Sequence, residues 1–537
     1  MVSKDERRPL GTTDCRMPLS GSTQNVALVI FFGVSLLKVL LVPSYRSTDF
    51  DVHRNWLSIT HHLPVNEWYT ADHSRHTLDY PPLFALFEKS ISKLAAVLWG
   101  DSWVCLALLK DDNNVPDDAC VWFCRASVIV SDIVLLVAVT VFVCSTSSSA
   151  KTRLHGKEVA LITLTNAGLL ILDHVHFQYN GFLLGLLILS ITFIEKRRTT
   201  ITLAGAFLFG SLIMMKHLYL PLGLVYFIFL LRHHCTSIVR FIILAVVTIT
   251  SLGLPLVPFL LSTQPMTRDG VLQHGAQILS RLFPFGRGLV HAYWAGNAWG
   301  LYMGVDRVLN LGCRLLFGSE FVVDGKRLGR NGGGSTDGLV NDVPPAILPA
   351  VSPLFCIAFI VLFSAPVVLN LWNSKRSKRR KHLFTRAIAS VAFTTFMFGY
   401  HVHEKAIMTS VLLYGLVSFE NIELARMFLR LSVVGHFSLL PLLFKKQELV
   451  IKVALWILHM CLSKHLLMVR FGRRLVTQWD WVVFGGLIAV VIFVEVIHPV
   501  FLGGVEKLQF IPLMLTSMVT AILNAILFAR HFALLQK

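Results

Sequence analysis

Residues 25–43 read NVALVIFFGVSLLKVLLVP, and Lys38 is the one charged side chain among them. A transmembrane helix needs about 20 consecutive, predominantly apolar residues, so this run predicts one. The same character extends over the 537-residue chain, which is 54% hydrophobic and 15% charged, with a mean hydropathy of +0.65. Soluble domains carry roughly 25% charged residues. The sequence therefore predicts an all-α, polytopic membrane protein and excludes a single soluble core.

Apolar runs of this kind recur along the chain and predict about 14 transmembrane helices. They cover residues 25–43, 121–144, 158–173, 180–194, 200–215, 217–231, 238–261, 347–372, 383–400, 404–418, 424–443, 448–463, 479–497 and 509–529. The membrane domain thus extends over 25–529. A polar tail at 1–24 precedes it, and a second tail at 530–537 follows it; we expect both tails in the cytoplasm.

Two connections are much longer than the others, at residues 44–120 and 262–346. Alternation of the spans places both on the non-cytoplasmic side. The first contains amphipathic stretches at 51–62 and 83–99, which predict helices.

The charges of the connecting segments test this topology. The chain has a net charge of +18 and no nucleic-acid-binding motif, and its basic residues lie in short loops, most densely at 375–386. The predicted cytoplasmic segments carry 27 Lys and Arg, against 5 in the short loops opposite, as expected when positive loops stay inside. This arrangement requires a turn at 216–217; one helix over 200–231 would place the cluster at 375–386 outside.

The nine cysteines are scattered, and most lie in apolar runs, where a thiol is a small hydrophobic group. No CxxC motif occurs, so neither a zinc ribbon nor a redox pair is indicated. Cys105 and Cys120 are the two that one long polar loop could bring together. We nevertheless expect all the thiols to be unpaired.

Five polar clusters fall on the non-cytoplasmic side. They are TDFDVHRNW (48–56), LDYPP (78–82), DHVHFQYN (173–180), HAYWAGN (291–297) and HVHEK (401–405). They lie at helix ends and in loops, whereas a transporter places such residues near the middle of the membrane. The pattern predicts a site open to one compartment.

Asp49 follows the first span closely and has two interpretations. A carboxylate held at the membrane surface could act as a general base, but Asp is also a favoured N-cap for a helix over 51–62. The residue alone favours the cap. Asp49 and Asp51 form a D-x-D pair, a weak metal–nucleotide signal. Asp79 and Tyr80 lie in a turn before the helix at 83–99 and could hydrogen-bond and stack on a sugar.

Ionisable groups in the cluster 173–180 lie close to the hydrocarbon, where they are costly and are functional candidates by default. The candidates are Asp173, His174, His176 and Gln178. Alternate residues do not share a face of a helix, so a metal held by His174 and His176 would need extended backbone.

Cationic groups gather at 401–405, and Lys216 is a further one. His401, His403 and Lys405 suggest recognition of a phosphate. The alternative for Lys405 is that its long side chain extends to the membrane interface.

Five segments carry a family resemblance. They are TDFDVHRNWLSITHHLPVNEWY (48–69), LDYPPLFALFE (78–88), DHVHFQYNGFL (173–183), SRLFPFGRGLVHAYWAGNAWGLY (280–302) and FGYHVHEKAI (398–407). In this order they resemble the endoplasmic-reticulum glucosyltransferases that use dolichyl-phosphate glucose. The chain is most similar to the branch that adds the second glucose, and the branch that adds the first is the near alternative.

The resemblance implies a GT-C fold in the endoplasmic-reticulum membrane, with the active site facing the lumen. It implies an inverting transfer of glucose in α-1,3 linkage. The donor would be dolichyl β-D-glucosyl phosphate, and the acceptor a mono-glucosylated, nine-mannose oligosaccharide on dolichyl diphosphate. No nucleotide has to be held, so neither a metal nor another cofactor is expected. A lipid or sugar transporter is the alternative from another class.

The resemblance also suggests roles for individual residues. It makes Asp49 the general base, which would be reached by the acceptor hydroxyl on the face opposite the leaving group. Cations would stabilise the leaving phosphate, and aromatic or polar groups would contact sugars. The expected substrate-binding residues are Asp79, Tyr80, His174, His176, Gln178, Lys216, Tyr293, Trp294, His401, His403 and Lys405.

Overall fold

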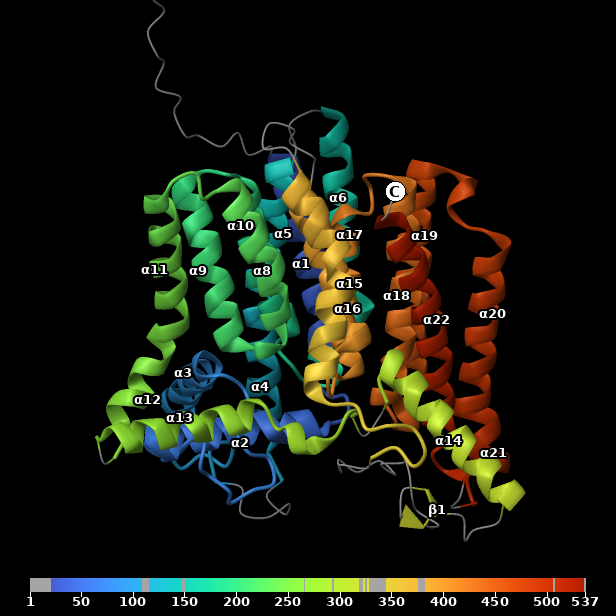
Figure 1. The fold of residues 1–537 in the computed structure, drawn as a ribbon, viewed down its shortest axis with the longest axis horizontal. Helices are drawn as coiled ribbons and strands as arrows, with labels where there is room; N and C mark the ends of the chain where they lie inside the picture. The colour runs from blue at the N-terminus through green and yellow to red at the C-terminus, as the bar shows by residue number, and fades with distance from the viewer. Residues whose placement is uncertain are drawn as a thin grey trace, which may run out of the picture.

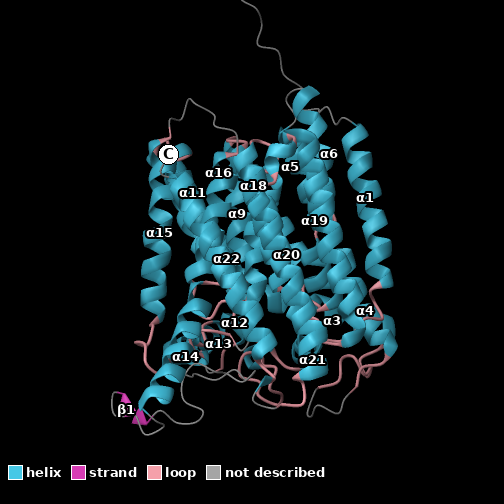
Figure 2. Cartoon of the chain, turned by 90° about the vertical axis from the view of Figure 1, so that its right-hand side faces the viewer, coloured by secondary structure: helices cyan, strands magenta, loops and turns pink. Residues whose placement is uncertain are grey.

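The computed structural model describes residues 21–108, 115–146, 150–264, 266–291, 294–317, 322–323, 326–327, 344–374, 382–505 and 508–535. Its main body is a bundle of helices that run up and down (Figures 1 and 2). These are α1 (Gly21–Leu40), α4 (Asp118–Ser131), α5 (Ile133–Thr146), α6 (Ala150–Leu164), α7 (Ala167–Leu169), η2 (Leu170–Val175), α8 (Asn180–Glu195), α9 (Thr199–Met215), η3 (His217–Leu222), α10 (Gly223–His233), α11 (Ile238–Gly253), η4 (Leu254–Leu256), α12 (Val257–Ser262), α15 (Pro353–Asn373), α16 (Leu383–Phe398), α17 (Ile407–Val417), α18 (Ile422–Ser438), α19 (Leu449–Phe471), α20 (Gln478–Ile492), η10 (Phe493–Ile497), α21 (His498–Phe501) and α22 (Ile511–Leu535).

Every predicted span contains helix, so the all-α, polytopic prediction is confirmed. Seven described helices are long and apolar enough to cross a membrane. They are Asp118–Ser145, His155–Val175, Ile238–Ser262, Pro353–Asn373, Lys446–Phe471, Gln478–Phe501 and Ile511–Ala533. Five shorter apolar helices accompany them, and the total of 14 stays a prediction. The predicted turn at Lys216 is confirmed, because α9 ends at Met215 and η3 begins at His217.

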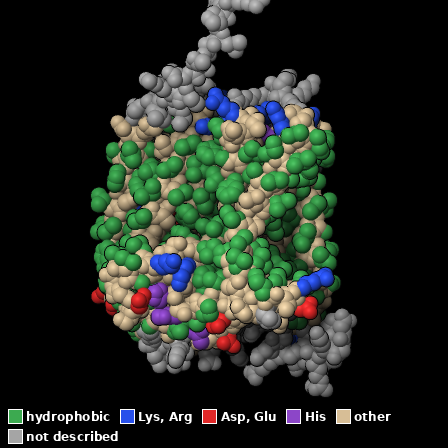
Figure 3. Space-filling view, turned by 90° about the vertical axis from the view of Figure 1, so that its left-hand side faces the viewer, with side chains coloured by type: hydrophobic (Ala, Val, Ile, Leu, Met, Phe, Trp, Pro, Cys, Tyr) green, Lys and Arg blue, Asp and Glu red, His purple; other side chains and the backbone are tan. Residues whose placement is uncertain are grey.

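The bundle has a buried centre and an apolar outside. All residues of α16 except its first and fourth are buried, and all of α17 are, whereas α11 and α20 each bury a single residue. Helices that are apolar all round and exposed belong in lipid. Figure 3 shows a continuous apolar band on one face, and the Asp and Glu side chains visible there lie at its lower edge.

A layer of surface helices covers the lower end of the bundle (Figure 1). It comprises α2 (Thr48–His62), η1 (Val65–Glu67), α3 (Pro82–Trp99), α13 (Arg268–Leu282), η5 (Phe285–Arg287) and α14 (Ala298–Phe317). The amphipathic helices predicted at 51–62 and 83–99 are thus confirmed as α2 and α3. Strands β1 (Val322–Val323) and β2 (Lys326–Arg327) form a short antiparallel pair. Short turns η6 (Glu404–Ala406), η7 (Leu440–Leu442), η8 (Lys446–Glu448) and η9 (Arg473–Leu475) join the later helices.

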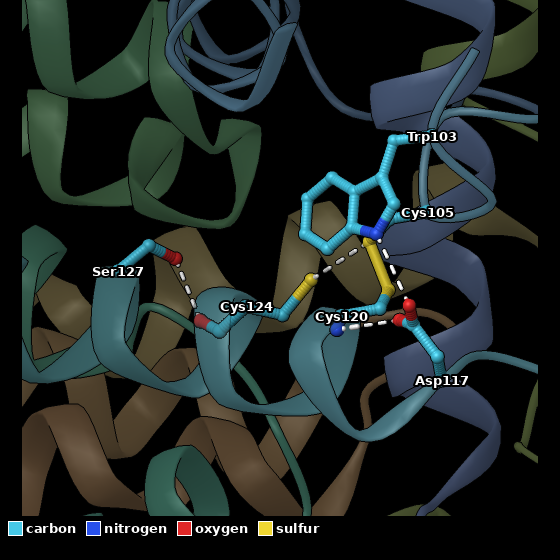
Figure 4. Close-up of a disulfide and its surroundings, with 6 residues drawn as sticks. All are labelled: Trp103, Cys105, Asp117, Cys120, Cys124 and Ser127. Atoms are coloured by element: carbon cyan, nitrogen blue, oxygen red, sulfur yellow. Dashed lines mark hydrogen bonds between the residues drawn. A yellow bond between two sulfur atoms is a disulfide. The ribbon is translucent and has the colours of Figure 1, made fainter. Parts of the chain in front are cut away.

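The expectation of unpaired cysteines is wrong for one pair, because Cys105 and Cys120 form a disulfide (Figure 4). Asp117 brings the second cysteine into place: its Oδ1 accepts from the backbone N–H of Cys120, which caps α4, and its Oδ2 accepts from Trp103. The sequence had indicated these two cysteines as the pair that one loop could bring together, but not the contacts of Asp117. The disulfide fixes the end of the first long connection against the start of α4.

Candidate functional site

Asp49 lies in the first turn of α2, at the lower end of the bundle. The N-cap of that helix is Ser47, whose hydroxyl donates to the backbone carbonyl of His176 instead of capping α2. The interpretation of Asp49 as the helix cap is therefore wrong. Its side chain is 24% exposed and faces a group of cationic and polar side chains.

Two hydrogen-bond donors and one imidazole nitrogen converge on one oxygen of Asp49. Oδ2 accepts from Nε2 of Gln178 and from Nζ of Lys405, each at 2.6 Å. Nε2 of His176 lies 3.4 Å from the same oxygen. In the part of the chain that the structure describes, no hydrogen bond reaches Oδ1. One carboxylate oxygen is thus held firmly while the other is available to a substrate.

The charges around Asp49 decide its protonation state. Burial raises the pKa of the carboxyl, but Lys405 and His176 outweigh burial and hold the pKa well below its usual value. Burial, and then Lys405, lower the pKa of His176, whereas Asp49 opposes that fall. Asp49 is therefore an ionised acceptor beside a lysine ammonium.

A chain of amides links this carboxylate to a second lysine. Oε1 of Gln178 accepts from Nδ2 of Asn180 at 2.8 Å, and Oδ1 of Asn180 accepts from Nζ of Lys216 at 3.1 Å. Nδ2 of Asn180 also donates to Asp173 at 2.9 Å. Because each amide has its donor and acceptor ends satisfied, Gln178 is oriented with its NH₂ group toward Asp49.

Lys216 lies between this chain and an aromatic ring. Its Nζ is 5.2 Å from the centroid of the Tyr80 ring, within reach of a cation–π interaction. Burial, and then repulsion by Lys405, lower the pKa of Lys216 to about 8. The two lysines therefore approach the same site from the α9–η3 turn and from the segment before α17.

An unusual backbone path separates His174 from His176. Residues Leu170–Val175 form a π-helix, and Phe177 follows with a φ of 80°. π-helical turns and left-handed non-glycine residues are rare and concentrate at functional sites. The break turns His176 and Gln178 toward Asp49.

His174 points elsewhere. Its Nε2 lies 2.8 Å from Oδ2 of Asp132, which also accepts from Nζ of Lys38 at 2.6 Å. All three side chains are buried inside the bundle. His174 thus contacts Asp132 and not Asp49, and it does not pair with His176.

Arg125 joins the segment after α1 to the π-helical segment. Its guanidinium donates to the carbonyls of Leu41 and Tyr45 on one side and to those of His174 and Val175 on the other. The side chain is 2% exposed. It sets the two segments that carry Asp49 and His176 side by side. Arg125 was not among the predicted site residues, because nothing marks it within a mainly apolar helix.

Asp79 and Tyr80 lie on the other side of Lys216. Oδ2 of Asp79 is 3.3 Å from Nη1 of Arg287, an ion pair between the two long connections. Burial raises the pKa of Asp79, and Arg287 opposes that rise. Tyr80 packs on Trp56, with ring centroids 4.9 Å apart. Asp79 thus already has a strong partner, and its contact with a sugar stays a prediction.

Within the segment 401–405, some residues make structural contacts and others face Asp49. His401 has a φ of 52°, and its Nδ1 bonds the carbonyl of Gly288 at 2.9 Å. The His403 and His291 rings are 4.1 Å apart. Burial, with Lys405, lowers the pKa of His403. Of the three predicted phosphate-binding groups, Lys405 alone contacts Asp49 directly.

One group near Asp49 has ligand atoms suited to a metal. Atoms of His291, His403 and Glu404 lie within 4.8 Å of one another, and imidazole and carboxylate are ligands that zinc uses. The expectation of no metal stays a prediction. Another such group combines Cys124 with Cys105 and Cys120, but the last two are bonded to each other.

Trp294 is buried and lines a cavity of about 330 Å³ together with Glu404, Ser438 and Thr516. Tyr293, expected beside it as a sugar-stacking residue, lies outside the described residues. The cavity reaches the 401–405 segment through Glu404.

The arrangement suits transfer of a group from an anionic leaving group to a hydroxyl. An ionised carboxylate with one free oxygen can accept a proton. Two nearby ammonium groups can stabilise a phosphate on which negative charge grows.

The chain is similar to known proteins over most of its length. Residues 34–531 match the model of the ALG6, ALG8 glycosyltransferase family. A mouse protein named dolichyl pyrophosphate Glc1Man9GlcNAc2 alpha-1,3-glucosyltransferase is 39% identical, with 91% of this chain and 92% of that protein covered. An Arabidopsis thaliana protein of the same name is 38% identical, covering 91% and 94%. A Drosophila melanogaster protein named as a probable enzyme of this kind is 37% identical, covering 90% of each.

Proposed function

Because the chain belongs to the ALG6, ALG8 glycosyltransferase family, we propose that it adds the second glucose to the lipid-linked precursor of N-glycans. The donor is dolichyl β-D-glucosyl phosphate, and the acceptor is Glc1Man9GlcNAc2 on dolichyl diphosphate. The names of the mouse, fly and plant relatives support this acceptor. The transporter alternative is not retained, because the family is one of glycosyltransferases.

The observation that carries the proposal is the environment of Asp49. In the proposed reaction Oδ1 accepts the proton of the C3 hydroxyl of the acceptor glucose. The hydroxyl oxygen bonds to C1 of the donor glucose as the bond from C1 to the phosphate oxygen breaks. Dolichyl phosphate leaves with the electron pair, and configuration at C1 inverts because the base and the leaving group lie on opposite faces.

Lys405 and Lys216 have complementary roles in this reaction. Lys405 keeps Asp49 ionised between turnovers and, with Lys216, provides positive charge for the departing phosphate. In this proposal Tyr80 and Trp294 contact the sugars. No step requires a metal, since the leaving group is a phosphate monoester and carries no nucleotide.

The proposed location is the endoplasmic-reticulum membrane, with Asp49 facing the lumen. The protein crosses the membrane several times. The excess of Lys and Arg in the opposite loops supports a luminal Asp49. The disulfide between Cys105 and Cys120 lies in the same long connection as Asp49, and disulfides persist in oxidising compartments such as this lumen.

The acceptor distinguishes the proposal from the sister activity, which adds the first glucose to Man9GlcNAc2. Purified protein is given dolichyl-phosphate glucose with each acceptor in turn, and the products are separated by mass. We expect transfer to Glc1Man9GlcNAc2 and at least about 100-fold less to Man9GlcNAc2. Man9GlcNAc2 lacks the terminal glucose, so the polar groups of the site that bind this glucose would be left unpaired. Preference for the unglucosylated acceptor would assign the chain to the sister activity.

A further inference from the structure

An apolar groove is lined by residues of α18, α19, α20 and α22. It lies at the end of the bundle where the C-terminus lies, opposite the end that carries α2 (Figure 1). Its volume is about 740 Å³. Its walls are mainly aliphatic and aromatic. Charged side chains occur as Arg430, Lys464, Asp480 and Arg530.

The groove exists because α20 packs loosely on its neighbours. Leu487 is the only buried residue of α20, all of which the structure describes. Trp479 and Trp481, at the start of α20, are each about half exposed and line the groove. Tryptophans concentrate at the level of lipid headgroups, so the groove begins at a membrane surface and continues into the hydrocarbon.

At the end of the groove that lies at the membrane surface, the positive charges outnumber the negative charges. Arg430 makes a bidentate ion pair with Asp480, at 2.7 and 3.2 Å, so these two charges cancel. Lys464 lies over the Trp481 ring, 4.5 Å from its centroid. Neither Lys464 nor Arg530 makes an ion pair within the described part of the chain. Two positive charges therefore stand at the entrance of an apolar groove.

We propose that this groove binds an anionic glycerophospholipid of the adjacent membrane leaflet. The headgroup phosphate lies at Lys464 and Arg530, and an acyl chain fills the groove between α20 and α22. The lining residues Leu523 to Arg530 span roughly 10 Å of helix at 1.5 Å per residue, about a third of a hydrocarbon core of ~30 Å. A basic pocket between transmembrane helices is a known form of lipid-headgroup site.

The position of the groove distinguishes this lipid from the substrates. The donor phosphate is displaced beside Asp49, at the opposite surface, a bilayer thickness of ~30 Å away. A dolichyl phosphate placed at Lys464 could not reach that site. The occupant is therefore a structural lipid, and it would tie the loosely packed α20 to the bundle.

The test measures lipid binding by native mass spectrometry of the purified full-length protein. Delipidated protein is titrated with phosphatidylserine or phosphatidylcholine, and binding is compared with that of Lys464→Gln/Arg530→Gln. A control double variant, Lys196→Gln/Arg240→Gln, removes two cations elsewhere. We expect preference for phosphatidylserine and roughly 30-fold weaker binding in the groove variant, from the contribution of each cation near a surface.

A second readout keeps the test independent of how well the variant folds. Phosphatidylserine should raise the Tm of the wild-type and control proteins, and phosphatidylcholine should not; the groove variant should lose this response. Equal binding of both lipids, or the same loss in the control, would overturn the proposal. So would displacement of phosphatidylserine by dolichyl phosphate at equal concentration, since this would make the groove a substrate site.

Discussion

Nζ of Lys405 lies 2.6 Å from Oδ2 of Asp49, although the two residues are 356 positions apart in the chain. The contact joins the first turn of α2 to the segment before α17. It places a positive charge beside Oδ2 of the carboxylate and leaves Oδ1 available to the substrate. A base held in this way is ionised before the acceptor arrives, and its proton-accepting oxygen has a defined position.

Removal of Lys405 should change both the rate and its pH dependence. Asp49 is active as the anion, so activity is present above its pKa and is lost as the pH falls through that pKa. The Lys405 ammonium lowers this pKa. In Lys405→Met the pKa rises, so the acidic limb of kcat/KM should move to higher pH. We expect a loss of about 10²–10³-fold in kcat, as for one electrostatic donor.

Lys405→Arg is the matched control. It keeps the charge and should leave the acidic limb near its wild-type position, although its geometry differs. An unchanged pH profile in Lys405→Met would exclude control of Asp49 by this lysine.

Lys216 should set the alkaline limit of activity. Burial and Lys405 lower its pKa to about 8, so it is charged below that pH and neutral above it. Activity that depends on the ammonium should decline as the pH rises through about 8. Lys216→Arg should abolish that decline, since guanidinium stays charged. Steady-state rates between pH 6 and 10 measure this, and a decline that persists in Lys216→Arg would assign the limb to another group.

Gln178→Glu should impair Asp49 as a base while conserving the shape of the side chain at position 178. The change replaces an N–H donor to Oδ2 with a second carboxylate, which repels Asp49 and raises its pKa. We expect kcat near pH 7 to fall by at least tenfold and to recover partly at higher pH. KM should change little. A fall in rate that does not depend on pH would indicate that Gln178 acts through shape alone.

His174 and His176 should respond differently to alanine. His174 belongs to a buried ion group with Asp132 and Lys38, and breaking such a group costs about 3–5 kcal/mol of stability. His174→Ala should therefore lower Tm while the folded fraction retains activity. His176→Ala should lose activity with a smaller effect on Tm. The opposite outcome would indicate that His174, and not His176, acts in the substrate site.

The disulfide should stabilise the surface helices. Cys105 and Cys120 are 15 residues apart, and closing a loop of that size contributes about 3 kcal/mol in the chain-entropy account. Cys105→Ser/Cys120→Ser should unfold at a lower temperature and become insensitive to reductant. Cys461→Ser removes an exposed free thiol and should match wild type. An effect of reductant that survives in the double variant would point to another cause.

The sequence predicts the helices and their order because apolar runs and loop charges are local properties. The turn at Lys216 followed from the charge cluster after α15, without any knowledge of packing. The role of Asp49 came from a family resemblance; its position in the sequence favoured a helix cap, and Ser47 occupies that place. Local patterns could not distinguish these roles, because both place an acidic residue at the start of α2.

What the sequence did not predict depends on contacts between distant segments. His176 and Gln178 reach Asp49 because a π-helix and the left-handed Phe177 redirect the chain, and no residue type marks such a break. Asn180 was part of a polar cluster, but its bonds to Gln178 and Lys216 needed the packed bundle. Arg287 and the Cys105–Cys120 pair belong to the same class of tertiary contacts.

The rate of glucose transfer by Asp49→Asn, measured against Asp51→Asn, tests the central claim most directly. Asp51 lies in the same turn of α2 and makes no contact with Lys405, so it controls for loss of a carboxylate. With dolichyl-phosphate glucose and Glc1Man9GlcNAc2 on dolichyl diphosphate, Asp49→Asn should lose about 10²–10⁴-fold in kcat, the usual contribution of a general base, with an unchanged Tm. Asp51→Asn should remain within a few-fold of wild type. Near-wild-type turnover by folded Asp49→Asn would contradict the account.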